Sequence, residues 1–254
     1  MSRTGDELDL RMMALALEVA RRGAPSPNPH VGAVIVREGR VIGLGHHERA
    51  GGPHAEIDAL SKLQEDASGA TLYVTLEPCK HVGRTGPCCG AILASGITRV
   101  VIGCEDPVSA HAGGARMLRE QGVDVRMGVR RDEAERLVAD FRKHACQGLP
   151  YVVLASSDRV PDPQMLWASN FEKHVAFDAV LHSAGIVPPA HLGLREILVE
   201  SECVTNCAEL EQLLRRLAQE DVVRLLVAAE SALAAIFKAG GFVDEWLEEA
   251  INSM

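Results

Sequence analysis

Apolar and polar positions recur with two different periods along the first half of the chain. Leu8, Met12 and Leu15 fall three or four residues apart, which predicts one apolar helical face over residues 7–22. Further on, short runs of β-branched and apolar residues predict strands, and the amphipathic stretches between them predict helices. The predicted strands cover residues 31–36, 41–45, 70–76, 99–104 and 123–129, and the predicted helices cover residues 54–63, 89–96, 115–121 and 132–144.

The order of these elements predicts the fold class. The first two strands flank the turn Arg37-Glu38-Gly39-Arg40, which indicates a hairpin, and the later strands alternate with helices. Such alternation favours a sheet that helices cover on both faces and that is largely parallel after the hairpin. We therefore predict an α/β fold with three layers, α/β/α, for a first domain over residues 1–145.

The second half of the chain is less regular, although it also suggests α/β structure. Residues 156–195 show no clear period and are interrupted by prolines. Elsewhere strands are predicted over residues 151–155, 197–201 and 223–229, and helices over residues 207–219 and 230–239. We predict a second, small α/β domain over residues 146–254.

Charged residues are divided unevenly between the two predicted domains. Residues 1–145 contain 19 basic and 19 acidic residues, whereas residues 146–254 contain 7 basic and 16 acidic residues. The net charge of −9 therefore belongs to the second half. An acidic chain without basic clusters is a poor partner for a polyphosphate, so we expect no nucleic-acid partner.

The sequence also favours a cytoplasmic protein with no membrane partner. It has no run of roughly 18 apolar residues, the length that a membrane span needs. Its polar N-terminus lacks the apolar core of a signal peptide. The seven cysteines are an odd, scattered set, which is typical of free or metal-bound thiols in a reducing compartment.

Three residues of the first domain have the chemistry of a zinc site. His54 opens a predicted helix, Cys79 follows Pro78 after a predicted strand, and Cys88 precedes the next helix. A neutral imidazole and two thiolates suit zinc and leave the fourth tetrahedral position for water. Glu56 lies two residues from His54, where it can exchange protons with that water. This is the His-x-Glu…Pro-Cys…Cys signature of zinc hydrolytic deaminases.

Each of these residues has a structural interpretation when it is taken singly. A lone histidine is usually a satisfied polar residue, and a lone buried cysteine usually serves packing. The combination, in this order and in a strand–loop–helix context, favours zinc. Cys89 is the alternative ligand, although its place on the helix points it elsewhere. The other cysteines are interpreted as core or surface thiols: Cys104, Cys146, Cys203 and Cys207.

Three segments resemble a known family: PSPNPHVGAVIV (25–36), GHHERAGGPHAEIDAL (45–60) and GATLYVTLEPCKHVGRTGPCCGAI (69–92). They are similar to the deaminase domain of the bifunctional riboflavin-biosynthesis deaminase/reductase family, in the zinc cytidine-deaminase-like superfamily. Eight residues separate Cys79 from Cys88, whereas tRNA-adenosine and cytidine deaminases typically have Cys-x-x-Cys. The insert between these two cysteines is characteristic of the family, which argues against a polynucleotide deaminase.

The resemblance implies a cytidine-deaminase-like fold and a reaction, the hydrolytic deamination of 2,5-diamino-6-ribosylamino-4(3H)-pyrimidinone 5′-phosphate. It implies one Zn²⁺ per chain, held by His54, Cys79 and Cys88, whose water would attack the ring carbon that bears the amino group. Glu56 would take the proton of that water and deliver it to the ring nitrogen and then to the leaving amine. The substrate contacts implied by the resemblance involve six residues: Asn28, His47, Lys80, His81, Arg84 and Asp106.

For Asn28 and Lys80, a structural interpretation stands beside the proposed substrate contact. Asn28 lies between two prolines, and its structural interpretation is a rigid turn. The structural interpretation of Lys80 is a solvated charge in a loop. Arg84 lies in the same loop as Lys80, and both would contact the ribose phosphate through charge-assisted hydrogen bonds.

The loop after Asp106-Pro107 departs from the family pattern. The family continues with Asn-Pro, whereas this chain has Val108-Ser109. Gly113-Gly114-Ala115 replaces a Gly-x-Gly element, and the loop is one residue shorter. This change leaves the zinc chemistry intact, so a related, modified aminopyrimidine stays open as the substrate.

The second half resembles a shortened form of the family's NADPH-dependent reductase domain. Residues 148–155 are similar to its start and residues 223–246 to a segment near its end, but the chain between them is too short for the whole domain. Ala155 replaces a lysine of the family, and Glu230 replaces a glycine that would admit the cofactor. NADPH is therefore not expected, and this degenerate domain is expected to cover the deaminase domain or to build a homodimer. Asp244-Glu245 is expected in a helix turn used for packing or dimer contacts.

Two other functions stay open at this point. One is a bifunctional deaminase/reductase whose second site is not recognisable in the sequence. The other is a non-enzymatic scaffold that presents the acidic half to a partner. The complete set of His54, Glu56, Cys79 and Cys88 argues against a scaffold, which has no use for an open metal position beside a general base.

Overall fold

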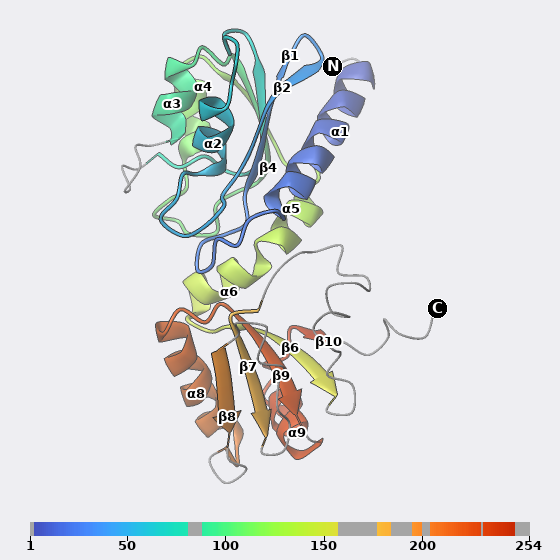
Figure 1. Ribbon diagram of the computed structural model, residues 1–254, viewed down its shortest axis with the longest axis vertical. Coiled ribbons are helices and arrows are strands. Elements are labelled where there is room, and N and C mark those ends of the chain that lie inside the picture. The colour runs from blue at the N-terminus through green and yellow to red at the C-terminus, as the bar shows by residue number, and fades with distance from the viewer. Residues whose placement is uncertain are drawn as a thin grey trace. The chain divides into compact units, whose positions relative to one another are not determined.

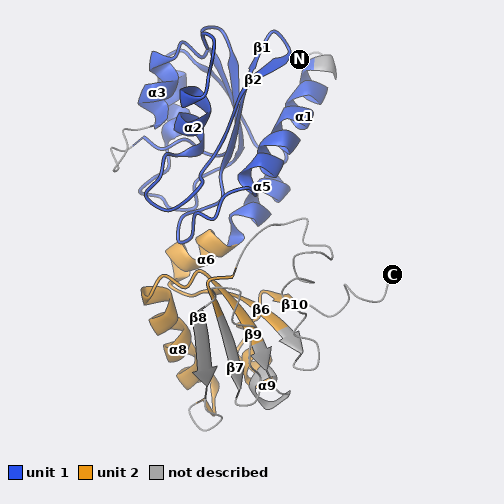
Figure 2. Cartoon of the chain, in the orientation of Figure 1, with its two compact units in different colours: residues 1–139 blue, residues 140–254 orange. Residues whose placement is uncertain are grey.

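The computed structural model describes residues 3–80, 88–156, 177–183, 195–199, 204–229 and 231–246. The chain divides into two compact units, residues 1–139 and residues 140–254 (Figure 2). Each unit contains one five-stranded sheet and its own hydrophobic core. Among the described residues, no helix has both the length and the apolar character needed to cross a lipid bilayer.

The sheet of the first unit begins with a hairpin and continues with parallel strands (Figure 1). Its strands are β1 (Gly32–Arg37), β2 (Arg40–His46), β3 (Thr71–Leu76), β4 (Arg99–Cys104) and β5 (Asp124–Met127). They lie in the order β2-β1-β3-β4-β5, where β1 is antiparallel to β2 and β3, and β3, β4 and β5 are parallel.

Helices cover both faces of this sheet, so the predicted three-layer α/β/α fold is confirmed (Figure 1). The helices are α1 (Arg3–Ala20), α2 (Ala55–Ser61), α3 (Cys88–Ala94), α4 (Gly114–Glu120) and α5 (Arg131–Leu137). α1 and α5 contact each other on one face, whereas α3 contacts both α2 and α4 on the other face.

Close packing between strand and helix fixes the start of α2. Five of the six residues of β3 are buried, because helices cover the central strands on both sides. On β2, a Cβ atom added to Gly45 would lie only 2.3 Å from the backbone of both Ala55 and Ala59. Glycine at this position therefore lets α2 approach the sheet directly, which holds the helix turn that carries Glu56.

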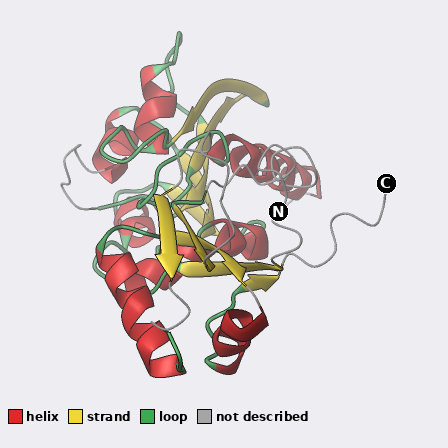
Figure 3. Ribbon diagram, turned by 60° about the horizontal axis from the view of Figure 1, so that its bottom comes forward, coloured by secondary structure: helices red, strands yellow, loops and turns green. Residues whose placement is uncertain are grey.

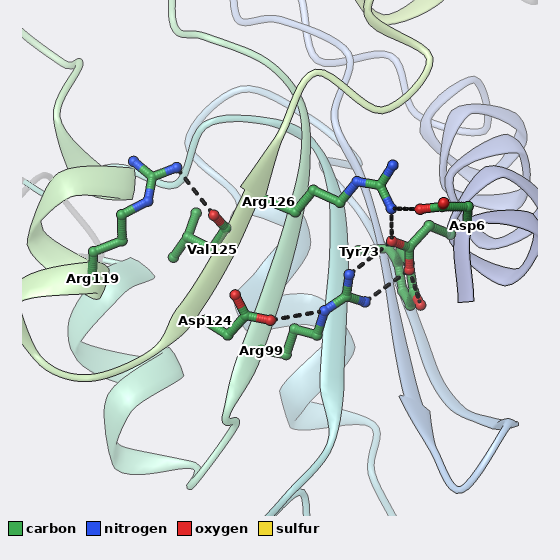
Figure 4. A network of polar contacts seen from close by, with 8 residues as sticks. Asp6, Tyr73, Arg99, Arg119, Asp124, Val125 and Arg126 are labelled. Carbon is green, nitrogen blue, oxygen red and sulfur yellow. Dashed lines mark hydrogen bonds and ion pairs between the residues drawn. The ribbon is translucent and has the colours of Figure 1, made fainter. Parts of the chain in front are cut away.

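A network of ion pairs links α1 to three strands of the first unit (Figure 4). The carboxylate of Asp9 is 1% exposed and accepts hydrogen bonds from Arg99 at 2.8 and 2.7 Å and from the Tyr73 hydroxyl at 2.9 Å. Arg126 donates to Asp9 at 2.7 Å and pairs with Asp6. These contacts connect the first helix to β3, β4 and β5.

The chain between the two units differs from its sequence prediction. One helix is predicted over residues 132–144, but the structure divides this stretch into α5 and α6 (Ala139–Gln147). The backbone of Val138 leaves the helical conformation (φ −106°, ψ 15°), and its side chain is fully buried in the core of the first unit. The apolar period continues across this break, so the sequence pattern does not reveal it.

The sheet of the second unit is parallel throughout, and helices pack beside it (Figure 3). Its strands are β6 (Tyr151–Ser156), β7 (Ala179–Ser183), β8 (Arg195–Val199), β9 (Arg224–Ala229) and β10 (Glu245–Trp246), in the order β10-β6-β9-β7-β8. α8 (Cys207–Gln219) and α9 (Ser231–Ala239) agree closely with the predicted helices. The side chain of Asn206 caps α8 by accepting hydrogen bonds from the backbone of Ala208 (3.0 Å) and Glu209 (3.1 Å).

The predicted helix turn at Asp244-Glu245 is wrong, because this segment leads into strand β10. Asp244 and the backbone of Val152 exchange hydrogen bonds of 2.7 and 2.9 Å, and Lys143 pairs with the Asp244 carboxylate. Glu245 lies 3.2 Å from the guanidinium of Arg224. Both acidic side chains therefore hold the edge of this sheet within the second unit.

Candidate active site

The three predicted metal ligands come together at one end of the first unit's sheet. His54 immediately precedes α2, Cys79 follows the end of β3, and Cys88 is the first residue of α3. Their ligand atoms all lie within 4.8 Å of one another, and His54 Nδ1 is 3.3 Å from Cys88 Sγ and 3.6 Å from Cys79 Sγ. Tetrahedral zinc separates a nitrogen ligand from a sulfur ligand by about 3.6 Å. The donor set and its spacing therefore fit a single metal ion.

The local hydrogen bonds favour a thiolate in this cluster. A hydrogen bond from Cys88 lowers the pKa of the Cys79 thiol to about 4 and raises the pKa of Cys88. The backbone N–H of Cys88 also donates to Cys79 Sγ at 3.4 Å. The contact with Cys79 in turn raises the pKa of His54. The lowered pKa favours the thiolate of Cys79, which is the form of cysteine that binds metal.

Glu56 lies in the first turn of α2, beside the three ligands. Its side chain is buried, with 3% exposure, and burial raises the pKa of its carboxyl group. The neighbouring Cys88 thiol has a smaller, opposite effect on that pKa. A carboxyl group with a raised pKa holds a proton more readily than an exposed one, which suits a group that must take up and release a proton as a general acid–base catalyst.

Asn28 and His47 form a second polar group next to the ligands. His47 Nδ1 donates to the carbonyl oxygen of Pro53 at 2.8 Å, so Nε2 accepts from Asn28 Nδ2 at 3.0 Å. The rings of His47 and His54 meet edge to face, with their centroids 5.5 Å apart. Burial lowers the pKa of His47, which favours the neutral ring that this hydrogen-bond pattern needs.

Asp106 and Lys80 lie around the loop that follows β4. Asp106 is mostly buried; its carboxylate accepts a 2.8 Å hydrogen bond from the backbone of Val108 and lies 3.8 Å from His111 Nδ1. Burial raises the pKa of Asp106. The Lys80 ammonium lies against Gly113 of the same loop. The other two predicted substrate contacts, His81 and Arg84, lie outside the described residues.

The neighbour of Cys88 has a different role. The thiol of Cys89 is buried and lies 3.7 Å from both the Pro78 and Gly114 carbonyl oxygens. It therefore faces the backbone of a neighbouring loop, whereas Cys88 faces His54 and Cys79.

Glu77 is a residue of this region that the sequence analysis missed. It is 7% exposed, and its carboxylate accepts backbone hydrogen bonds from Gly113 (3.1 Å) and Ala115 (2.9 Å), with the Asp106 N–H at 3.5 Å. The available signal was an acidic residue directly after an apolar strand and two positions before Cys79. A buried carboxylate in that position needs several hydrogen-bond donors.

Comparison with known proteins gives the same assignment. The family model for the cytidine and deoxycytidylate deaminase zinc-binding region matches residues 6–104. Diaminohydroxyphosphoribosylamino-pyrimidine deaminase of Buchnera aphidicola subsp. Schizaphis graminum is 43% identical over 141 residues, which are 54% of this chain and 96% of that protein. The chain belongs to this deaminase family. The family predicted from the sequence is thereby confirmed.

Longer relatives extend beyond the deaminase region. Riboflavin biosynthesis protein RibD of Aquifex aeolicus is 52% identical over 151 residues, which are 58% of this chain but only 42% of that protein. The match therefore spans less than half the length of this relative.

Solved structures resemble both units of this family member. A diaminohydroxyphosphoribosylaminopyrimidine deaminase/5-amino-6-(5-phosphoribosylamino)uracil reductase from Thermotoga maritima has a TM-score of 0.79 and 28% identity. That likeness covers 92% of this chain and 84% of the other. RibD of Acinetobacter baumannii gives a TM-score of 0.75 and 29% identity, covering 95% of this chain and 86% of the other.

Proposed function

We propose that this chain is a zinc-dependent hydrolase that deaminates 2,5-diamino-6-ribosylamino-4(3H)-pyrimidinone 5′-phosphate and releases ammonia. The observation that carries this proposal is the convergence of His54, Cys79 and Cys88 beside the buried Glu56. Family membership supports the choice of substrate, because the Buchnera relative bears the name of this deaminase.

Zinc is the proposed metal because one imidazole and two thiolates form a soft, closely spaced donor set. His54 Nδ1 and the sulfur atoms of Cys79 and Cys88 would hold it. When bound, zinc supplies the activation of water for attack on an electron-poor ring carbon.

Glu56 is the proposed proton carrier. It accepts a proton from the attacking water and passes it to the ring nitrogen; it then takes the proton of the hydroxyl group so formed and passes it to the amino group, so that ammonia leaves and a carbonyl oxygen remains. The balanced result is that water replaces the amino group by a carbonyl oxygen and one ammonia is released. The buried position of Glu56 and the raised pKa of its carboxyl group support this exchange.

The substrate is proposed to bind between the Asn28–His47 pair and the loop after β4. The Asn28 amide hydrogen-bonds to His47, so its oxygen would accept a hydrogen bond from the ring of the substrate. Lys80, His81 and Arg84 would bind the ribose phosphate side, and Asp106 would bound the same pocket. The contacts of Lys80 and Asp106 with one loop support this arrangement.

We infer that the second unit has no catalytic role and does not bind NADPH. Its 7 basic and 16 acidic residues, counted from residue 146, give a field that opposes a polyphosphate cofactor. Asp244 and Glu245 are both used in contacts inside the unit. We further propose that the protein acts on a small-molecule substrate, binds no nucleic acid, forms a homodimer and is located in the cytoplasm.

The test is ammonia release by the zinc-loaded full chain from the diaminopyrimidine phosphate, followed by product mass. Turnover with ammonia in a 1:1 ratio to product supports the proposal. The dephosphorylated compound is the second substrate of the experiment. Turnover of the dephosphorylated compound alone would make a modified aminopyrimidine the substrate, the alternative that the changed loop at Val108-Ser109 leaves open. No turnover of either compound would contradict the proposed function.

A further inference from the structure

The Glu77 carboxylate links the segment 77–79, which ends at Cys79, to residues 106–115, which comprise the loop after β4 and the first two residues of α4. These residues are called the loop 106–115 below. Glu77 follows β3, and its own N–H donates to the carbonyl oxygen of Cys104 at the end of β4 (3.0 Å). Its carboxylate oxygens face backbone N–H groups of Asp106, Gly113 and Ala115. Among the described residues, no cationic side chain lies within ion-pair distance of Glu77. Backbone amides of residues 106–115 are therefore the hydrogen-bond donors that this buried carboxyl group uses.

Close backbone packing makes a second connection between the same two segments. A Cβ atom added to Gly114 would lie 1.8 Å from the carbonyl oxygen of Pro78, so the loop touches the segment that leads to Cys79. Gly113 adopts a left-handed conformation, with φ +102°, which glycine tolerates without strain. The Cys89 thiol lies between the Pro78 and Gly114 carbonyl oxygens, 3.7 Å from each. A shift of the loop would therefore disturb several contacts at once.

Two residues that the proposed function assigns to substrate binding, Asp106 and Lys80, lie in or against this loop. Asp106 begins it, His111 lies 3.8 Å from the Asp106 carboxylate, and the Lys80 ammonium lies against Gly113. These groups hold their positions only if the loop keeps its distance from Cys79. Glu77 fixes that distance through the loop's backbone.

We infer that Glu77 is a positioning residue, which sets substrate affinity by holding the loop 106–115 against the Cys79 segment. It leaves the proton transfers to Glu56. The expected effect on KM rests on the proposed deaminase function. The expected effect of Glu77 on the position of the loop does not depend on that function.

The test compares Glu77→Gln with wild type in steady-state kinetics with the diaminopyrimidine phosphate. The glutamine oxygen can still accept from Gly113 and Ala115, but its amide group opposes the N–H of Asp106. We expect KM to rise about tenfold while kcat stays within about twofold. Zinc content is expected to stay at one per chain. Unchanged KM, or a loss of kcat at unchanged KM, would overturn the inference.

Two further variants separate positioning from general loss of stability. Gly114→Ala pushes the loop away from Pro78 from the other side, so it should raise KM in the same way even if Glu77→Gln folds poorly. Asp9→Asn removes a buried carboxylate remote from the ligands, and KM is expected to stay at the wild-type value. A rise in KM for Asp9→Asn equal to that of Glu77→Gln would contradict a positioning role.

Hydrogen exchange distinguishes failure of this inference from failure of the proposed function. If wild type does not turn over the substrate, the proposed function fails. Exchange of the Gly113 and Ala115 amides still tests whether Glu77 holds the loop 106–115 in place. We expect faster exchange of residues 106–115 in Glu77→Gln and unchanged exchange in α1. Equal exchange in both proteins would refute the inference whatever the activity.

Discussion

His54 Nδ1 lies 3.6 Å from Cys79 Sγ, the spacing expected for two ligands of one tetrahedral zinc ion. Replacing Cys79 by serine removes the sulfur with the lowered pKa and should weaken zinc binding by more than about 100-fold, the upper range for loss of an outer-sphere partner. Zinc content after dialysis against a chelator, measured by mass spectrometry, tests this. Cys89→Ser is the matched control, because its thiol faces carbonyl oxygens outside the cluster. Equal zinc loss in the two variants would contradict the assignment of ligands.

The Asp9 network predicts a pH-dependent contribution to stability. Burial alone would raise the pKa of Asp9, but hydrogen bonds from Arg99, Tyr73 and Arg126 outweigh it, and the net pKa is lowered. The ionised form is therefore favoured by folding, and the stabilisation is present above the unfolded pKa of about 3.9 and is lost as pH falls below it.

Asp9→Asn should accordingly reduce the free energy of unfolding by about 2 kcal/mol at pH 7, since it weakens charge-assisted hydrogen bonds to a buried carboxylate. Urea unfolding of the first unit at several pH values is the measurement, and the difference from wild type should shrink below about pH 4. Asp124→Asn removes only the exposed partner of Arg99 and should change stability by less than about 0.5 kcal/mol. A difference that stays constant down to pH 3 would be incompatible with this account of the network.

Asn28→Ala tests the substrate role of the Asn28–His47 pair. The truncated side chain can no longer donate to His47 Nε2 or accept from a substrate, so KM should rise about tenfold or more. Zinc content should stay at the wild-type level, because Asn28 is not one of the ligands. Asn206→Ala is the control in the second unit: loss of the α8 cap should lower stability by about 1 kcal/mol. Its KM should match wild type; a rise there would assign the second unit a part in substrate binding.

The sequence reveals the metal ligands and Glu56 better than it reveals the tertiary contacts that hold them in place. His54, Glu56, Cys79 and Cys88 were predictable because metal and proton chemistry restrict the residue type at each position and its local spacing. Their side chains project from helix starts and a strand end, positions that follow from the apolar period.

The supporting contacts depend on tertiary structure and were not visible in the same way. Glu77 looks like an ordinary charged residue at a strand end, and its role depends on backbone groups 29 to 38 residues further along the chain. The break at Val138 interrupts a helix without interrupting its apolar period. The five residues of β7 are too few to establish a period, and parallel neighbours distant in sequence define that strand.

Glu56→Gln tests the central claim most directly. Glutamine keeps the size of the side chain but cannot carry the proton between water, ring nitrogen and leaving amine. We expect the variant to retain one zinc per chain and to lose about 1,000-fold in kcat for ammonia release from the diaminopyrimidine phosphate. Ammonia release at the wild-type rate by the zinc-loaded variant would contradict the assignment of Glu56, and with it the proposed mechanism.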